Sequence, residues 1–184
     1  MTDYAAQERL FAAAGDVDVV FANAGTGAKT AGTENGDPAN FEAMIRVNAL
    51  ALTYTAKLAI PVLKRTRGHL VVTGSRAGTA NFAGSVYGAT KWFVQGYAAN
   101  LAIELAGTGV RVTNIQPGAV DTPFFDDPKP DALRDDDVAR AFMFAIEQPD
   151  TVSIQSMLVV PTPKWSGPST DGDLALPRPP SSLT

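Results

Sequence analysis

The chain has 184 residues, of which 45% are hydrophobic and 18% charged, and its formal net charge at pH 7 is −4. This composition is ordinary for one globular domain with a real core, and the mild acidity gives no reason to expect a nucleic-acid partner. The sequence has no cysteine and one histidine, His69, which excludes disulfides, thiolate metal sites, cysteine nucleophiles and metal sites built on several histidines.

Apolar residues recur along the chain with a period that alternates between that of helices and that of strands. In chain order, the expected elements are a helix over 2–14, a strand over 17–22, a helix over 38–65, a strand over 68–75, a helix over 86–105, a strand over 110–115, a helix over 135–147 and a strand within 151–160. Asp37 and Pro38 mark the start of the second helix, which Pro61 could kink. Because Pro, Ser and Gly dominate from residue 161, we expect one domain over 1–162 and a disordered tail over 163–184.

This alternation of strands and helices predicts an α/β fold. We expect a partial Rossmann-type, doubly wound parallel sheet of about four strands, with helices on both faces. Ligands of such sheets bind beyond the carboxyl ends of the strands. Asn23, Ser75 and Pro117–Gly118 each follow or end an expected strand, so we expect a site at that edge.

The segment Tyr87-Gly88-Ala89-Thr90-Lys91 places a phenol and an amine on one face of a helix, because residues i and i+4 are neighbours there. A phenol with its usual pKa of about 10 is a poor acid/base at neutral pH. A nearby ammonium favours the phenolate and lowers that pKa, so the pair is a candidate for proton transfer. Chance pairs with this spacing are common on exposed helices, so the pair does not establish a function by itself.

Two further polar residues belong to the same candidate site. Ser75 ends an apolar strand, and its hydroxyl could orient a substrate carbonyl, although a serine at a strand end is commonly a cap or turn residue. Asn48 falls on the apolar face of the helix over 38–65. There it is either a buried amide bonded to the backbone or an anchor for a water in a proton path.

Five segments, in this order and at this spacing, resemble the short-chain dehydrogenase/reductase family. They are VDVVFANAG (17–25), RVNAL around Asn48, VVTGSRAG around Ser75, VYGATK around Tyr87 and RVTNIQPGAVDTP (111–123). The resemblance extends to about residue 162. The late segment over 135–162 resembles a subgroup that acts on small hydroxy acids, sugars and related alcohols.

The resemblance implies an NAD(P)-dependent oxidoreductase that interconverts an alcohol and a carbonyl by hydride transfer. Tyr87 would be the general acid/base, and Lys91 would lower its pKa and bind the nicotinamide ribose. Ser75 would position the substrate oxygen, and Asn48 would anchor the water of the proton path. The implied cofactor-binding residues are Asn23, Gly25, Tyr87, Lys91, Pro117, Gly118, Val120 and Thr122.

The chain departs from the family's pattern at its start. The family begins with a strand, a glycine-rich phosphate turn, a helix and two further strands, whereas the opening Thr2-Asp3-Tyr4 is similar to the end of the third strand. The resemblance therefore implies an N-terminally truncated domain that lacks the helix N-terminus which holds the pyrophosphate. We expect it to bind NAD or NADP, with no preference implied, and to bind them weakly. The glycines over 25–32 match neither the P-loop nor the G-x-G-x-x-G pattern.

Two alternatives to an active enzyme of this length stay open. The first is a catalytically impaired remnant that acts as a scaffold or interaction module. The second is a longer natural chain, which an in-frame glycine-rich strand-turn-helix segment upstream of Met1 would support.

The expected partners follow from the same observations. We expect a small-molecule alcohol or carbonyl substrate, no metal and no nucleic acid. No apolar run reaches the ~18 residues of a membrane-spanning helix and the N-terminus has no signal-peptide pattern, so we expect no membrane partner and a cytoplasmic location. The resemblance also implies a homo-oligomer that pairs through the two long helices. Their expected outward faces carry apolar groups such as Leu50, Tyr54, Phe93 and Tyr97.

Overall fold

The computed structural model describes residues 1–82 and 85–162, so the expected disordered tail over 163–184 lies outside the described residues. The helices are α1 (Tyr4–Ala14), α2 (Pro38–Met44), α3 (Ala51–Thr66), α4 (Val86–Glu104) and α5 (Asp135–Ile146). The strands are β1 (Val19–Ala22), β2 (His69–Thr73), β3 (Arg111–Pro117) and β4 (Ser156–Val159). Each of these elements overlaps one that the hydrophobic periodicity predicted.

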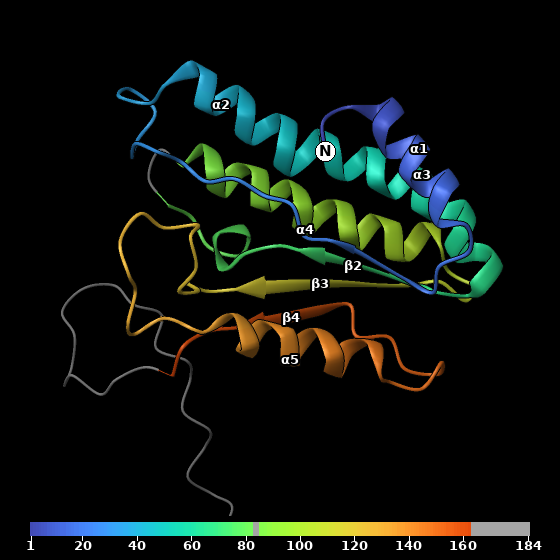
Figure 1. The fold of residues 1–184 in the computed structure, drawn as a ribbon. Coiled ribbons are helices and arrows are strands. Elements are labelled where there is room, and N and C mark those ends of the chain that lie inside the picture. The colour runs from blue at the N-terminus through green and yellow to red at the C-terminus, as the bar shows by residue number, and fades with distance from the viewer. Residues whose placement is uncertain (83–84, 163–184) are drawn as a thin grey trace, which may run out of the picture.

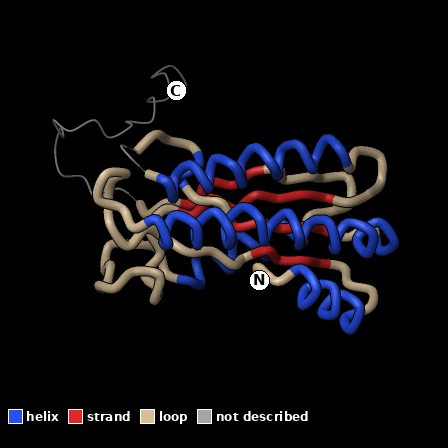
Figure 2. Tube along the Cα trace, turned by 90° about the horizontal axis from the view of Figure 1, so that it is seen from above, coloured by secondary structure: helices blue, strands red, loops and turns tan. Residues whose placement is uncertain are grey.

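The four strands form one parallel sheet in the order β1-β2-β3-β4. Val19 of β1 is in register with His69 of β2, which is in register with Arg111 of β3. Helices α1 to α4 lie over one face of the sheet, and α5 lies against the other (Figure 1). A second view shows loops gathered at one end of the sheet (Figure 2). The predicted α/β fold, with four parallel strands covered on both faces, is confirmed.

The larger part of the core lies between the sheet and the pair α3 and α4. Leu63 of α3, Leu70 of β2 and Leu101 of α4 are almost fully buried there. Each such side chain contributes roughly 1.5–3 kcal/mol when it leaves water. A smaller cluster, with Val71 and Ile115 against Ala141 of α5, fills the other side of the sheet. The sheet is therefore held from both faces, which fixes the positions of its strand ends.

The long helix expected over 38–65 consists of three segments. Between α2 and α3 the chain forms a π-helical stretch, Ile45–Leu50, which contains the buried Asn48. The α-helical structure of α3 continues through Pro61, so the departure from α geometry lies around Asn48 and not at the proline. Such π stretches occur frequently at functional sites.

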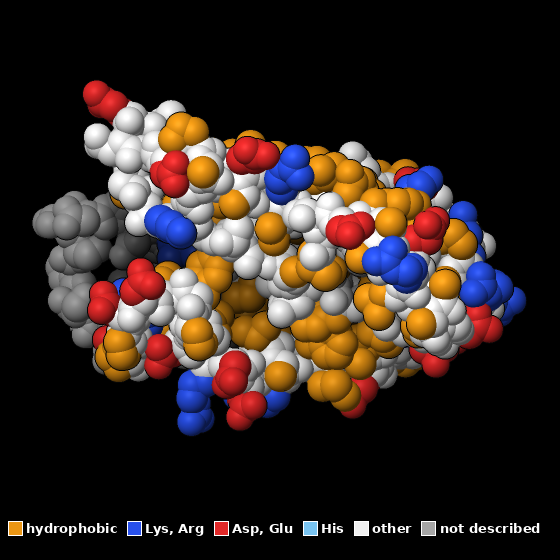
Figure 3. All heavy atoms as spheres, turned by 45° about the horizontal axis from the view of Figure 1, so that its top comes forward, with side chains coloured by type: hydrophobic (Ala, Val, Ile, Leu, Met, Phe, Trp, Pro, Cys, Tyr) orange, Lys and Arg blue, Asp and Glu red, His pale blue; other side chains and the backbone are white. Residues whose placement is uncertain are grey.

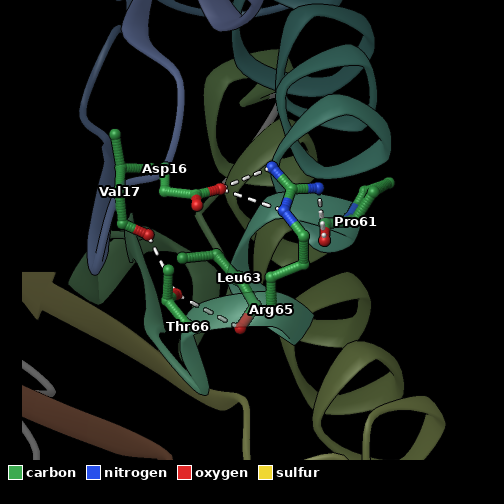
Figure 4. A network of polar contacts seen from close by, with 6 residues as sticks. All are labelled: Asp16, Val17, Pro61, Leu63, Arg65 and Thr66. Atoms are coloured by element: carbon green, nitrogen blue, oxygen red, sulfur yellow. Dashed lines mark hydrogen bonds and ion pairs between the residues drawn. The ribbon is translucent and has the colours of Figure 1, made fainter.

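Contacts at the amino ends of the strands tie α3 to the segment before β1 (Figure 4). The Nε and Nη2 atoms of Arg65 donate to Oδ1 of Asp16 at 2.9 and 2.7 Å. Thr66 Oγ1 donates to the carbonyl oxygen of Val17 at 3.0 Å. Because both members of the ion pair are largely exposed, the pair contributes only about 0–1 kcal/mol. This end of the sheet is thus joined by structural contacts.

Candidate active site

A cavity of about 1160 Å³ opens at the carboxyl ends of the strands. Asn23 follows β1, Ser75 follows β2 and Gly118 follows β3, and all three line it, because parallel strands bring their carboxyl ends to the same edge. The molecular surface is hollowed near the middle of the face shown in Figure 3, where hydrophobic side chains form the floor. All eight predicted cofactor-binding residues line the cavity: Asn23, Gly25, Tyr87, Lys91, Pro117, Gly118, Val120 and Thr122.

Lys91 lies in the cavity wall and is only 4% exposed. Its Nζ atom donates to the carbonyl oxygen of Thr73 at 2.8 Å and lies 5.8 Å from the centre of the Tyr87 ring. Burial lowers the pKa of Lys91 from 10.5 to about 8. The amine is therefore still mostly charged at neutral pH. An ammonium has three protons, so the Thr73 carbonyl leaves donor capacity for a ligand.

The side chains of Tyr87 and Ser75 both line the cavity, and Ser75 lies close enough to Tyr87 to favour its phenolate form. Burial raises the pKa of Tyr87 above its usual value of 10, and the side chain of Ser75 opposes that rise. The expectation that the pKa of this phenol is lowered is wrong for the structure as it stands, because lost hydration outweighs the favourable contacts of the phenolate. At neutral pH the phenol therefore carries its proton.

Asn48 lies behind the cavity wall and joins two elements. Its Oδ1 atom accepts the Thr26 amide at 2.8 Å, and its Nδ2 atom donates to the Thr26 carbonyl at 2.9 Å. The same nitrogen donates to Thr90 Oγ1 at 3.0 Å, and that hydroxyl donates to the Tyr87 carbonyl at 2.7 Å. The side chain is thus a buried amide bonded to backbone. Both Nδ2 protons are used in these bonds, so the amide nitrogen has none left to donate to a water. The role of Asn48 as a water anchor stays a prediction.

The loop after β1 approaches the Lys91 amine closely. Thr73 Oγ1 donates to Asn23 Oδ1 at 2.8 Å, which links the ends of β1 and β2. A Cβ atom on Gly25 would stand 3.5 Å from Asn48 Oδ1 and 3.6 Å from Lys91 Nζ. A larger side chain at Gly25 would fill the space beside the amine, so the glycine keeps that space open for a ligand.

The structure adds residues that the sequence did not reveal as part of the site. Thr73 holds Lys91 through its main-chain carbonyl, and no side-chain pattern signals such a contact. Phe124 stands beside Tyr87 with ring centres 5.9 Å apart. A Cβ atom on Gly27 would come within 2.7 Å of the Phe124 ring, so this glycine makes room for it. The pair Phe124-Phe125 after Thr122 was the available signal for an aromatic wall.

Two kinds of site are absent from the part of the chain that the structure describes. Its His, Asp and Glu side chains form no group of three that could hold a metal ion. None of its helices combines the length and the apolar character needed to cross a membrane.

Comparison with known protein sequences gives one family and several relatives. A family model described as short chain dehydrogenase matches residues 1–132. An NADP-dependent 3-hydroxy acid dehydrogenase of Salmonella typhi is 35% identical over 162 residues, a match that covers 79% of this chain. The match covers 65% of that relative, so the chain spans about two thirds of its length.

Comparison with solved structures gives the same fold. Serine dehydrogenase from Escherichia coli superposes with a TM-score of 0.79 at 32% identity, covering 87% of this chain and 72% of that one. An alcohol dehydrogenase from the archaeon Thermococcus sibiricus, complexed with 5-hydroxy-NADP, superposes with a TM-score of 0.80 at 29% identity. That superposition covers 91% of this chain and 74% of the archaeal one.

Proposed function

Because the chain belongs to the short-chain dehydrogenase family, we propose that it is an oxidoreductase that interconverts an alcohol and a carbonyl compound with NAD or NADP. The observation that carries this proposal is that the hydroxyls of Ser75 and Tyr87 lie with the buried amine of Lys91 on the wall of one cavity. We assign Ser75, Tyr87 and Lys91 to catalysis, with Asn48 behind them. A small alcohol or carbonyl compound is the proposed partner.

The polar side of the cavity fits the nicotinamide end of the cofactor. Lys91 has donor capacity beyond the Thr73 carbonyl, so with Tyr87 it would bind the ribose hydroxyls. Gly25 leaves room beside that amine. The remaining residues proposed to flank the cofactor are Asn23, Pro117, Gly118, Val120 and Thr122. When bound, the nicotinamide supplies or accepts the hydride.

The chain's own contribution is orientation and proton transfer. Ser75 and Tyr87 both present a hydroxyl to the cavity, so they can bind one substrate oxygen together. Because burial keeps the Tyr87 phenol protonated at neutral pH, it is ready to donate a proton to a carbonyl oxygen that becomes an alcohol. The reverse reaction needs the phenolate, so we expect alcohol oxidation to speed up as pH rises.

A panel assay tests this proposal. The chain is mixed with NADPH or NADH and a set of aldehydes, ketones and oxo acids, and loss of reduced nicotinamide is followed by absorbance. One relative is NADP-dependent and a similar structure was solved with 5-hydroxy-NADP, so NADPH is tested first. We expect turnover of at least one carbonyl compound. If the protein turns over no compound of the panel with either nucleotide, the proposal is contradicted, and a scaffold or interaction module is favoured instead.

We also propose that the chain self-associates through the outward faces of the π-helical stretch, α3 and α4. Leu50 and Phe93 are 37% and 41% exposed there. Phe93 stacks on Tyr97 with ring centres 5.6 Å apart, while Tyr54 packs against Tyr4 of α1. Sedimentation at micromolar concentration tests this, and a single monomeric species would contradict it.

A further inference from the structure

Charges are few on the wall of the cavity. Its lining includes three side chains that are charged at neutral pH: the cations Arg76 and Lys91 and the anion Asp135. The Lys91 amine is bound to the Thr73 carbonyl, and the Asp135 carboxylate accepts the Asp136 amide at 2.9 Å. Among the described residues, the guanidinium of Arg76 has neither a hydrogen-bond nor an ion-pair partner. Arg76 is an exposed residue at the cavity wall, so its guanidinium can pair with a ligand without breaking a contact within the described residues.

The backbone of Arg76 is fixed beside the catalytic hydroxyl. Residues Arg76–Gly78 form a single 3₁₀ turn, and the Ser75 side chain caps it by accepting the Ala77 amide at 3.1 Å. Thr79 closes the turn, since its amide and hydroxyl donate to the Arg76 carbonyl at 3.0 and 2.8 Å. A Cβ atom on Gly78 would come within 2.4 Å of the Lys91 carbonyl, so the turn packs tightly on α4. The main chain of Arg76 therefore has a set position relative to both Ser75 and Lys91, and its exposed side chain begins from there.

Part of the cavity wall is aromatic. Phe82, Phe124 and Phe125 line the cavity. An aromatic wall accepts an apolar group, but it offers the guanidinium no counter-ion. Arginine binds carboxylates with two parallel hydrogen bonds, and such charge-assisted bonds are among the strongest in proteins.

We propose that Arg76 binds the carboxylate of the substrate and so selects oxo and hydroxy acids with an apolar body. The reacting end of this assignment rests on the proposed function, in which Ser75 and Tyr87 bind the carbonyl or hydroxyl oxygen. Because Arg76 adjoins Ser75 in the chain, the two side chains can hold the two ends of one short acid. The aromatic wall then receives the apolar part of the molecule.

The first test compares the turnover of an acid with that of its uncharged amide analogue. The substrates are 3-hydroxy-3-phenylpropanoate and 3-hydroxy-3-phenylpropanamide, which have the same skeleton. In Arg76→Met, we expect kcat/KM for the acid to fall about 10- to 100-fold, mainly through KM, as the loss of a charge-assisted pair implies. The value for the amide should stay within about twofold, and Arg76→Lys should recover part of the loss for the acid. Arg9→Met, on the exposed surface of α1, is the matched control.

Equal losses for acid and amide, or a raised KM for the nucleotide, would overturn the proposal and make Arg76 a structural or cofactor-binding residue. A second measurement needs no turnover. Calorimetric titration with 3-phenylpropanoate and 3-phenylpropanamide should show tighter binding of the acid to the unaltered chain and equal binding to Arg76→Met. Equal binding of the two probes to the unaltered chain would refute the role of Arg76. The panel assay, by contrast, tests the oxidoreductase activity itself, so the two proposals can fail separately.

Discussion

The sheet has a buried base at each end, and the two bases differ in what surrounds them. Lys91 lies at the carboxyl end of β2 and His69 at its amino end, and they are 4% and 1% exposed. Burial lowers the pKa of Lys91 to about 8, and burial together with the nearby Arg111 charge lowers the pKa of His69 to about 4. Lys91 opens onto a large cavity beside two hydroxyls. The ring of His69 is instead buried over the sheet, where its Nε2 lies 2.7 Å from Thr113 Oγ1 of β3.

A perturbed pKa therefore does not by itself identify an active site in this molecule. The shift at His69 comes from burial in the sheet, and its Nδ1 atom has no partner among the described residues. The shift at Lys91 has the same main cause, but this amine stands where a ligand can reach it. We interpret the carboxyl end as the chemical end of the sheet and the amino end as structural.

Replacement of Tyr87 should have the largest effect. Tyr87→Phe removes the proposed proton carrier. General acid/base catalysis contributes about 10²- to 10⁴-fold, so turnover should fall by at least about 10²-fold. Steady-state rates measure it. Tyr97→Phe, the same change on the same helix but outside the cavity lining, is the control and should keep its activity. Near-normal turnover by Tyr87→Phe would contradict the proposed mechanism.

Lys91→Met should separate chemistry from stability. Turnover should fall by roughly 10²-fold, because the charge beside Tyr87 and a proposed ribose ligand are lost. The melting temperature should not fall, since methionine is apolar and the ammonium is already disfavoured by burial. Steady-state rates and thermal unfolding test the two halves. If Lys91→Met has a much lower melting temperature and yet keeps its turnover, Lys91 has a structural role and not a catalytic one.

The pH dependence of stability should report on His69 at the other end. Its folded pKa of about 4 lies below the unfolded value of 6.5, so the neutral ring contributes stability that is present above pH 6.5 and is lost as pH falls towards 4. The loss should be on the order of 3 kcal/mol. Denaturant unfolding of His69→Leu should show a flatter decline over this window, with turnover at neutral pH unchanged. An equally steep decline would show that other groups cause the acid sensitivity.

The smallest expected effect concerns the loop beside the cavity. Asn40 Nδ2 donates to the Gly27 carbonyl at 3.2 Å, and its Oδ1 accepts the Lys29 amide at 3.0 Å. Asn40→Ala removes both bonds, so we expect faster hydrogen exchange in this loop and a loss of about 1–2 kcal/mol of stability. KM should rise a few-fold with kcat almost unchanged. A large fall in kcat would mean that the loop takes part in the chemistry.

The sequence predicted much of the sheet and the cavity lining, because strand periodicity and strand ends are local features. Ser75, Tyr87 and Lys91 were identifiable as candidate site residues from their place after a strand or on a helix together with the family motifs around them. The π-helical stretch around Asn48 was not, since the same apolar spacing is compatible with a straight α-helix. The raised pKa of Tyr87 depends on how deeply the fold buries it. The unpartnered Arg76 in the cavity depends on contacts that no linear pattern contains.

The transfer of a label from the nicotinamide to the substrate tests most directly whether the active site lies at the carboxyl end of the sheet. The protein is incubated with a carbonyl substrate from the panel and with NADPH or NADH deuterated at the hydride-donating carbon. The mass of the alcohol product is then measured by mass spectrometry. If the carboxyl end of the sheet is the active site, the unaltered chain and His69→Leu will both yield labelled alcohol, while Tyr87→Phe will yield almost none. Label transfer by Tyr87→Phe at the rate of the unaltered chain, or its loss in His69→Leu, would contradict the assignment of chemistry to that end.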